Sequence, residues 1–303
     1  MVLELRRTFQ GCNTQELCRL FGFSRQAFYK HHKRLIKVTK EHKELLNQVQ
    51  LFRDSMPLIG SLKLYHMLKP FMAKQNIKLG RDGFFKMMKL QGLQIRKHRN
   101  TIRTTNSYHH FRKYNNLIKD LEITHPNYVW VTDITYVKVG KGFRYLWLIT
   151  DAYSRKIVGY NLSDTLEAKH GILALQKALG TLRYPPNDLI HHSDRGIQYC
   201  SHAYTSLLKS HGIRISMTQN GDPLENAIAE RINGIIKQEF LCQITNESIS
   251  IEQRLDSGVK IYNSQRPHLS TNMLTPDQAH QTSGALKRKW KNYYKQPVNL
   301  LQE

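Results

Sequence analysis

Thr218–Phe240 reads TQNGDPLENAIAERINGIIKQEF, a turn followed by an amphipathic helix around which the rest of the chain is organised. A Gly and a Pro break the chain, and Glu225 or Asn226 begins the helix. Glu230 and Lys237 are two helical turns apart, so both project from nearly the same side. Such a pair alone is typical of a solvated face. The apolar residues recur at helical spacing, at Ala227, Ile228, Ile232, Ile235 and Ile236.

Two aspartates upstream of this helix lie in short apolar runs. Asp133 occurs in VWVTDITYV, and Asp194 occurs in LIHHSDRGIQY. Runs of this length that are bounded by turn residues are typical of buried strands. Between Asp194 and Glu230 lie 35 residues. The sequence therefore offers two strand carboxylates and one helix carboxylate as candidate members of a single site.

This pattern resembles that of the DDE transposases and retroviral integrases. It resembles most the insertion-sequence transposases encoded in two overlapping frames, specifically their downstream-frame, OrfB-type product. In one respect the chain departs from that family, which commonly has Asp before the Asn where this chain has Glu225. The motifs that carry the resemblance span residues 55–276 and are Trp130 with Thr132-Asp133-Ile134-Thr135, Asp151 with Ser154-Arg155, His192-Ser193-Asp194-Arg195-Gly196, Asn226-Ala227 before Glu230, Lys237 with Glu239, and Tyr262-Asn263 with Arg266-Pro267-His268.

The resemblance implies a fold and a metal site. The fold class is α/β, a ribonuclease H-like integrase core with a mixed five-stranded sheet flanked by helices, preceded by small all-α helix-turn-helix units. Asp133, Asp194 and Glu230 would be the catalytic residues and the ligands of two divalent metal ions, Mg²⁺ with Mn²⁺ as a substitute. Hard cations of this kind take oxygen ligands, and two of them stabilise both the attacking and the leaving oxygen of a phosphodiester. Lys237 would reach a DNA phosphate beside the cut.

The implied activity is that of a transposase. It would cut the ends of an insertion sequence and then transfer the freed strand by attack of its 3′-hydroxyl on a phosphodiester. The implied partners are double-stranded DNA, as terminal inverted repeats and as target, a second copy in at least a dimer, and an upstream-frame OrfA-type protein or fusion. Two alternatives remain open, a catalytically inactive DNA-binding regulator and a structure-selective ribonuclease H-like nuclease.

The charge of the chain favours a polyanionic partner. The 303 residues carry a net charge of +23, and residues 1–120 hold 25 Lys and Arg against 7 Asp and Glu. A surplus of this size is typical of a nucleic-acid-binding segment. The four Cys are scattered, without the spacing of a disulfide framework or a zinc site. No apolar run reaches membrane-spanning length, so we expect no membrane partner and a cytoplasmic, nucleoid-associated bacterial protein.

Charge and periodicity divide the chain into five segments. Residues 1–40 are predicted to be a helix-turn-helix. Residues 41–93 are predicted to be a second helical, DNA-binding unit, and the family resemblance implies that it too is helix-turn-helix-like. Residues 94–125 form a basic linker expected to run extended on the surface. Residues 126–240 are the predicted catalytic core. Residues 241–303 are a C-terminal helical extension with a basic tail.

Both helical segments present candidate DNA-binding residues. In the first, Asn13 with Glu16 predicts a capping box, and Ser24 is expected to cap a second helix. The alternative is a helical hairpin that serves only packing. The residues expected to face DNA are Arg25, Gln26, Tyr29, Lys30 and Lys33 in the first segment, and Lys86, Lys89, Arg96, Lys97 and Arg99 at and after the end of the second.

From residue 129 the hydrophobic period becomes that of strands, which predicts strands over 129–139, 143–151, 156–161, 189–192 and 213–217. A helix is expected after a cap at Asp164 or Thr165, another after Ser201, and a third over 251–262. We expect Asp151 to pair with Arg155. His192 is expected to be a satisfied buried histidine, with an orienting role toward Asp194 as the alternative.

Two other glutamates compete with Glu230 for the role of third acid. Glu225 is five residues earlier, and helical geometry turns it about 500° from Glu230, well off that face. Glu239 is roughly 180° around the helix and should face away. We therefore assign the role to Glu230, which keeps the 35-residue spacing from Asp194.

Overall fold

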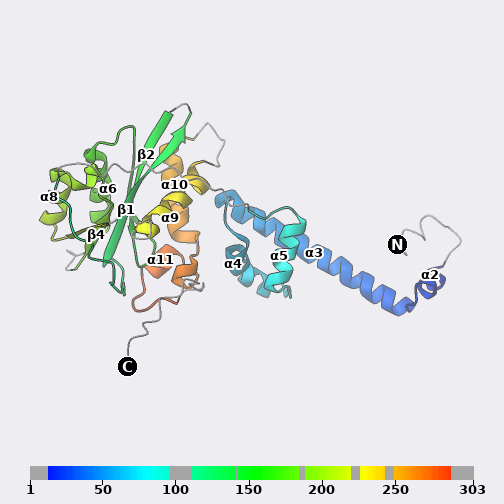
Figure 1. Ribbon diagram of the computed structural model, residues 1–303. Helices are drawn as coiled ribbons and strands as arrows, with labels where there is room; N and C mark the ends of the chain where they lie inside the picture. Colours follow the sequence, from blue (N-terminus) through cyan, green and yellow to red (C-terminus); the bar gives the residue numbers. More distant parts are fainter. Residues whose placement is uncertain are drawn as a thin grey trace, which may run out of the picture. The chain divides into compact units, whose positions relative to one another are not determined.

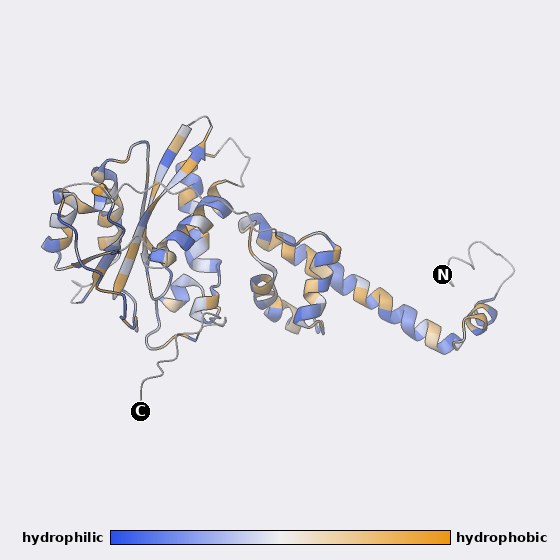
Figure 2. Cartoon of the chain, viewed as in Figure 1, coloured by the Kyte–Doolittle hydropathy of each residue, from blue (hydrophilic) through white to orange (hydrophobic). Residues whose placement is uncertain are grey.

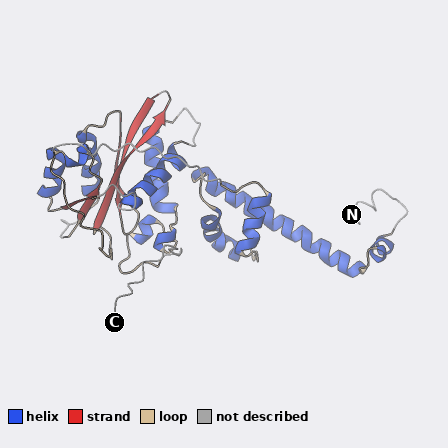
Figure 3. Ribbon diagram, in the orientation of Figure 1, coloured by secondary structure: helices blue, strands red, loops and turns tan. Residues whose placement is uncertain are grey.

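The computed structural model describes residues 13–95, 111–140, 142–183, 188–219, 226–242 and 249–287. These residues form two compact units. The first, the helical unit, comprises residues 1–54 and 64–94, and the second, the core unit, comprises residues 55–63 and 95–303. All strands among the described residues belong to the core unit (Figure 3).

The helical unit consists of α2 (Thr14–Leu20), α3 (Arg25–Ser55), α4 (Ser61–Lys74) and α5 (Arg81–Leu90). The predicted capping box at the start of α2 is present, with the side chain of Asn13 bonded to the backbone of Glu16 and the reverse. The Ser24 hydroxyl caps the next helix by accepting the Ala27 N–H at 3.1 Å. Leu45 and Val49 of α3 are buried, as are Leu64, Leu68, Met72, Phe84, Met87 and Met88 of α4 and α5.

Helix α3 is longer than the sequence suggests. It continues without a break across position 40, where the sequence analysis separates two helical segments. Its residues are largely hydrophilic along the whole length (Figure 2), and only two of its side chains are buried. The helix is therefore shared by both predicted segments. That each segment binds DNA separately stays a prediction.

The core unit is built on a mixed five-stranded sheet of order β3-β2-β1-β4-β5. Strands β1 (Val129–Val139), β2 (Gly142–Asp151) and β3 (Ile157–Ser163) are antiparallel neighbours. Strands β4 (Ile190–Ser193) and β5 (Arg214–Met217) run parallel to β1 and to each other. All five predicted strands are present to within two residues at each end, and the ribonuclease H-like fold class is confirmed.

Helices cover both faces of this sheet (Figure 1). On one face lie α6 (Ala168–Leu179), α7 (Ile197–Cys200) and α8 (His202–Ser210), around a core that includes Trp130 and Trp147. On the other lies α9 (Ala227–Ile235), whose Ala229 packs on Val129 and Val131. Because side chains alternate along a strand, Asp133 shares the α9 face of β1 with Val129 and Val131.

One predicted cap is wrong. The N-terminal capping position of α6 is Glu167, without a side-chain hydrogen bond to the helix, rather than Asp164 or Thr165. The Asp164 carboxylate pairs instead with Arg144 of β2 at 2.7 Å. The cap at Ser201 is confirmed, since its hydroxyl accepts the Tyr204 N–H at the start of α8. Asp164 therefore takes part in a surface ion pair and not in a helix cap.

The described part of the basic linker packs against the core. Phe111 and Tyr114 contact the hydrophobic cluster under α6 to α8, and residues 118–123 contact the cluster under α9. Between them the chain follows the free edge of β5, where the Met217 N–H donates to the Asn115 carbonyl at 3.3 Å and the Leu117 N–H to the Ser216 hydroxyl at 2.8 Å. These residues protect a sheet edge and belong structurally to the core, not to an extended surface linker.

The C-terminal extension begins with α10 (Ile251–Gln265), which ends before Arg266 as predicted. It continues through η3 (Leu269–Thr271) and α11 (Pro276–Ala279). The Asn263 side chain donates to the Ile157 carbonyl and accepts the Ile157 N–H, as a neighbouring strand would at the edge strand β3. No helix within the described ranges is long and apolar enough to cross a membrane.

Candidate active site

The two aspartates are brought together by the pairing of β1 with β4. Val131 of β1 lies beside His192 of the parallel strand β4, so Asp133 and Asp194 are each two residues further along at the same level. Asp194 follows the last residue of β4, and its Oδ1 accepts the Gly196 N–H at 3.0 Å. The side chains of both aspartates are partly exposed. Two neighbouring carboxylates therefore lie on the inner strands of the sheet, at the C-terminal end of β4.

Glu230 is the third acid and lies on α9. The buried side of that helix, with Ala229, Ile232 and Ile235, packs on the sheet and leaves Glu230 exposed. One turn later the Asn233 Nδ2 donates to the Asp133 Oδ2 at 2.9 Å. The α9 helix thus crosses the β1 strand directly at Asp133.

The charges of neighbouring acids raise the pKa values of Asp133 and Glu230. Burial, followed by the negative charge of Asp194, raises the pKa of Asp133 to about 7, and the hydrogen bond from Asn233 opposes this rise. The charge of Glu230 adds a smaller upward effect on the same pKa. The pKa of Glu230 is itself raised, first by burial and then by Asp194. No cationic side chain is among the causes of these two pKa shifts.

The chemistry of these residues suits a divalent cation. Three carboxylates supply the oxygen ligands that Mg²⁺ and Mn²⁺ take, and their mutual repulsion is what a bound cation would relieve. Among the described residues, however, no three His, Cys, Asp or Glu side chains gather closely enough to hold a metal ion. The donor set fits the ion by type and charge, whereas the side chains are not closed into one ligand set.

Asn226 is a site residue that the sequence analysis placed only at the helix start. Its side chain makes no helix cap, and its Nδ2 instead donates to the Thr132 carbonyl at 2.9 Å. Asn226, Glu230 and Asn233 recur at the spacing of one helix face, i, i+4 and i+7. That spacing is visible in the sequence, but it does not show which group on β1 each amide meets.

The helix that carries Glu230 and Lys237 is not α-helical throughout. The α-helix ends at Ile235, and a π-helical segment η2 (Ile236–Leu241) follows it. A π turn contains more residues than an α turn, so the assumption of two regular turns fails over the last steps to Lys237. Lys237 is partly exposed, and its contact with DNA stays a prediction. Glu225 lies outside the described residues.

Glu239 is engaged away from the acids, as expected from its position. Its side chain is 2% exposed, and its Oε2 accepts two hydrogen bonds from the Arg266 guanidinium at 2.7 and 2.9 Å. The motif residue Arg266 therefore fastens the C-terminal extension to η2. Tyr262 of the same motif donates to the Arg155 carbonyl, and His268 stacks edge-on against the Tyr262 ring. These motif residues hold the fold together.

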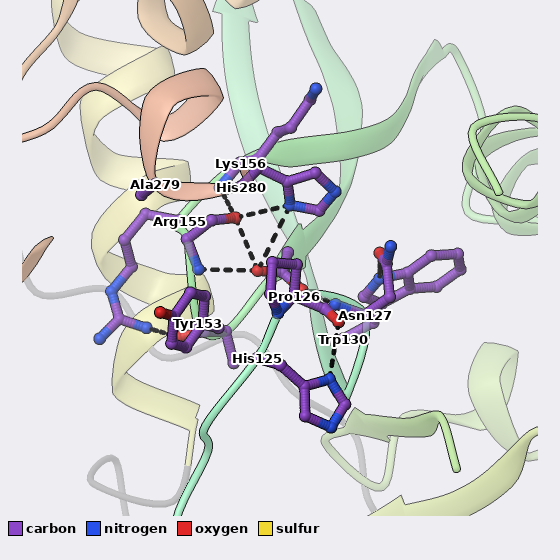
Figure 4. Close-up of polar contacts among 12 residues, drawn as sticks. His125, Pro126, Asn127, Trp130, Tyr153, Arg155, Lys156, Ala279 and His280 are labelled. Carbon is purple, nitrogen blue, oxygen red and sulfur yellow. Dashed lines mark hydrogen bonds and ion pairs between the residues drawn. The ribbon is translucent and has the colours of Figure 1, made fainter. Parts of the chain in front are cut away.

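Asp151 is a fully buried acid with a complete set of partners. Its Oδ1 accepts the N–H and the hydroxyl of Ser154 at 2.7 and 2.6 Å, and its Oδ2 accepts the Asn127 N–H at 2.6 Å. The Ser154 hydroxyl also lies 3.0 Å from the His280 Nδ1, next to α11 (Figure 4). The guanidinium of Arg155, expected to pair with Asp151, contacts the Ser270 hydroxyl and the Ala152 carbonyl.

The buried position expected of His192 is confirmed, while an orienting role toward Asp194 stays a prediction. The ring is buried, and its Nδ1 lies 2.8 Å from the hydroxyl of Ser216 on β5. That hydroxyl in turn accepts the Leu117 N–H of the segment along the sheet edge. The histidine thus joins β4 to β5 in the interior.

The candidate DNA-binding residues of the helical unit are exposed where the structure describes them. Arg25 lies over the Tyr29 ring, with its guanidinium carbon 5.7 Å from the ring centroid. Exposure is required of a residue that contacts DNA and does not by itself show contact. The exposed candidates are Arg25, Gln26, Tyr29, Lys30, Lys33, Lys86 and Lys89, while Arg96, Lys97 and Arg99 lie outside the described residues.

The sheet order, with two acids on adjacent parallel strands and a third on the crossing helix, defines an integrase-type core. A family model described as "Integrase core domain" matches residues 123–223, and a second with the same description matches residues 211–276. Both matches lie within the core unit and include all three acids between them.

Full-length relatives identify the family. The chain is 33% identical over 269 residues to the uncharacterized 31 kDa protein of insertion element IS600 from Shigella sonnei, a match covering 86% of this chain and 96% of that protein. It is 31% identical over 192 residues to the IS629 transposase of Shigella sonnei, covering 63% of each. It is 29% identical over 230 residues to transposase InsF of IS3A from Escherichia coli K12, covering 74% and 78%. The chain belongs to the insertion-sequence DDE transposases, and these relatives fit the OrfB type.

Solved integrase structures are similar in part. The catalytic core domain of HTLV-2 integrase in complex with magnesium is 22% identical with a TM-score of 0.44, covering 52% of this chain and 97% of that one. A chain of the simian T-cell lymphotropic virus intasome, solved in complex with the PP2A regulatory subunit B56 gamma, is 18% identical with a TM-score of 0.49, covering 80% and 77%.

Proposed function

We propose that the chain is a transposase that cuts DNA at the ends of an insertion sequence and joins the freed 3′-hydroxyl to a target strand. The observation that carries this proposal is the meeting of Asp133 on β1, Asp194 after β4 and Glu230 on α9, where the charges of neighbouring acids raise the pKa values of Asp133 and Glu230. Neighbouring acids that raise the pKa values of Asp133 and Glu230 lower the stability of the folded state. Proteins accept such a cost chiefly at functional sites.

In this proposal each acid has a defined task. Asp133 and Asp194 would hold two divalent metal ions, Mg²⁺ or Mn²⁺, from adjacent strands, and Glu230 would complete the set from α9. When bound, the ions neutralise the phosphodiester and favour ionisation of the attacking hydroxyl. The protein supplies the alignment of nucleophile and leaving group, which is the larger part of what phosphodiester cleavage needs. Lys237 would contact a phosphate beside the cut.

The helical unit would bind the terminal inverted repeats. Its exposed cations are the support for this assignment, and Lys86 and Lys89 are the exposed candidates on α5. Replacing both with Gln should weaken binding of a terminal duplex and lower the slope of log affinity against log salt by about two. An unchanged slope would remove α5 from the DNA interface. We further propose action as at least a dimer, with an OrfA-type partner or as a fusion.

The test is an assay of labelled terminal duplex with purified protein and Mg²⁺. The proposal expects a nick that leaves a 3′-hydroxyl at the element end, followed by transfer of that end into an unrelated plasmid. Binding without nicking would favour the inactive regulator. Nicking that depends on DNA structure and is never followed by joining would favour the ribonuclease H-like nuclease.

A further inference from the structure

Two asparagines flank Glu230 on its helix. Asn226 precedes it by four residues and Asn233 follows it by three, so all three side chains lie on one side of α9. Both asparagines are buried, with 6% and 2% of their surface exposed, whereas Glu230 is exposed. The two amides therefore lie between the helix and the sheet, one on each side of the glutamate along the helix.

Each amide reaches a different group on two consecutive residues of β1. The Asn226 Nδ2 donates to the backbone carbonyl of Thr132 at 2.9 Å. The Asn233 Nδ2 donates to the carboxylate of Asp133, also at 2.9 Å. The first contact depends only on the backbone, and the second depends on the acid itself. Together they fix both the position of α9 along β1 and the direction of the Asp133 carboxylate.

The same two side chains each bury a polar atom that lacks a hydrogen-bond partner in the described part of the chain. The Oδ1 of Asn226 and the Oδ1 of Asn233 are both buried without a hydrogen-bond partner among the described residues. A buried polar atom without a partner destabilises a fold, and an apolar side chain of similar size would avoid this. Packing alone thus gives no reason for an amide at either position. The donated hydrogen bonds to β1 do.

We propose that Asn226 and Asn233 form a two-point clamp that holds Glu230 at the Asp133 carboxylate, as positioning residues for divalent-metal binding. This inference rests on the proposed function, because it assumes that the three acids bind the metal. Asn226 anchors the start of α9, and Asn233 orients one ligand. Partners in contact with metal ligands typically contribute tenfold to a hundredfold to metal affinity.

The experiment measures Mn²⁺ binding to the full-length protein without DNA, by the loss of the free-Mn²⁺ electron paramagnetic resonance signal. Asn226→Ala and Asn233→Leu should each weaken Mn²⁺ binding about tenfold or more. Asn233→Gln keeps the amide donor on a longer arm and should recover part of the affinity. Nicking assayed against Mn²⁺ concentration should shift by the same factors, with less change at saturating Mn²⁺.

Asn263→Ala is the matched control. Asn263 also makes two side-chain amide bonds to a strand backbone, but at Ile157 on β3. It should lower the melting temperature and leave Mn²⁺ affinity unchanged. If Asn233→Leu does not fold, Asn233→Ser, which removes the amide with a smaller change in shape, takes its place.

The outcomes distinguish failure of the clamp from failure of the proposed metal site. Wild-type Mn²⁺ affinity in folded Asn226→Ala and Asn233→Leu proteins would overturn the clamp, as would an equal loss in Asn263→Ala. If Asp133→Asn binds Mn²⁺ as the wild type does, the acids are not the metal site, and both the proposed function and the clamp fail. Loss in Asp133→Asn with no loss in the asparagine variants overturns the clamp alone.

Discussion

Asp133 and Asp151 lie on adjacent strands of one sheet and have opposite surroundings. Asp151 is completely buried, and neutral donors from Asn127 and Ser154 occupy both of its oxygens. Asp133 is partly exposed and has like charges for neighbours, with Asn233 as a side-chain donor. The sequence presents both as an aspartate in or at the end of an apolar strand. The two acids therefore differ both in exposure and in partners, and the like-charged neighbours of Asp133 are what the sequence pattern does not reveal.

The largest expected effect is the loss of catalysis when Asp133 or Asp194 is replaced. Asp133→Asn and Asp194→Asn should each lower cleavage and joining by roughly 10³-fold or more, because the amide keeps the shape but loses the charge that binds a cation. Binding of the terminal duplex should remain, since the helical unit is unchanged. Nicking and gel-shift assays on the same protein samples measure both. Near wild-type nicking in either variant would refute its assignment.

The choice between two glutamates sharpens the comparison. Glu230→Gln should abolish strand cleavage in both Mg²⁺ and Mn²⁺, because the charge of Glu230 acts on Asp133 and that of Asp194 acts on Glu230. Glu225→Gln should leave partial activity or cost mainly stability. The assay is nicking of a labelled terminal duplex. An inactive Glu225→Gln beside an active Glu230→Gln would reverse the assignment.

Asp151→Asn should act on stability instead. The amide places an N–H donor against the N–H of Asn127 or Ser154 and removes two charge-assisted hydrogen bonds. We expect the free energy of unfolding of the core to fall by about 2 to 4 kcal/mol. Chemical denaturation measures this loss. Activity per folded molecule at low temperature should stay within a few-fold of wild type, and a catalytic loss as large as that of Asp133→Asn would place Asp151 in the active site.

The smallest expected effect is a gain in stability, in the variant Asp133→Asn at high pH. The folded-state pKa of Asp133 is raised to about 7, above its value of about 3.9 in an unfolded chain, so ionising it costs the folded state stability as pH rises from about 4 to about 7. In metal-free buffer Asp133→Asn should therefore raise stability by roughly 1 to 3 kcal/mol at pH 8 and leave it unchanged near pH 4. Thermal melts at the two pH values test this. Equal shifts at both would contradict the pKa argument.

Mg²⁺ provides the matching control within the same measurement. Because a ligand that binds only the folded state stabilises it, millimolar Mg²⁺ should raise the melting temperature of the wild type and not that of Asp133→Asn. Asp151→Asn should respond to Mg²⁺ as the wild type does, only from a lower starting temperature. This contrast separates the two aspartates by a measurement that needs no DNA.

Local sequence determined a large part of this protein. Alternating apolar residues set the strands, and the side chains of Asn13, Ser24 and Ser201 begin helices as expected because capping depends on neighbours within three residues. The spacing of Asp194 and Glu230, together with the motifs, identified the family and predicts three acids for its site. These features depend on residues close in the chain or on patterns shared by relatives.

Tertiary structure alone decided what distant residues do to one another. Nothing near Asn226 in the sequence indicates the Thr132 carbonyl, and nothing near Glu239 indicates Arg266 or the π-helical segment that their pairing accompanies. Residues 111–123 pack on the core because β5 leaves one side of the sheet open to them, and that open side exists only once the sheet has formed. Periodicity reports which side of an element is apolar, whereas a hydrogen bond across some 100 residues depends on where two elements meet.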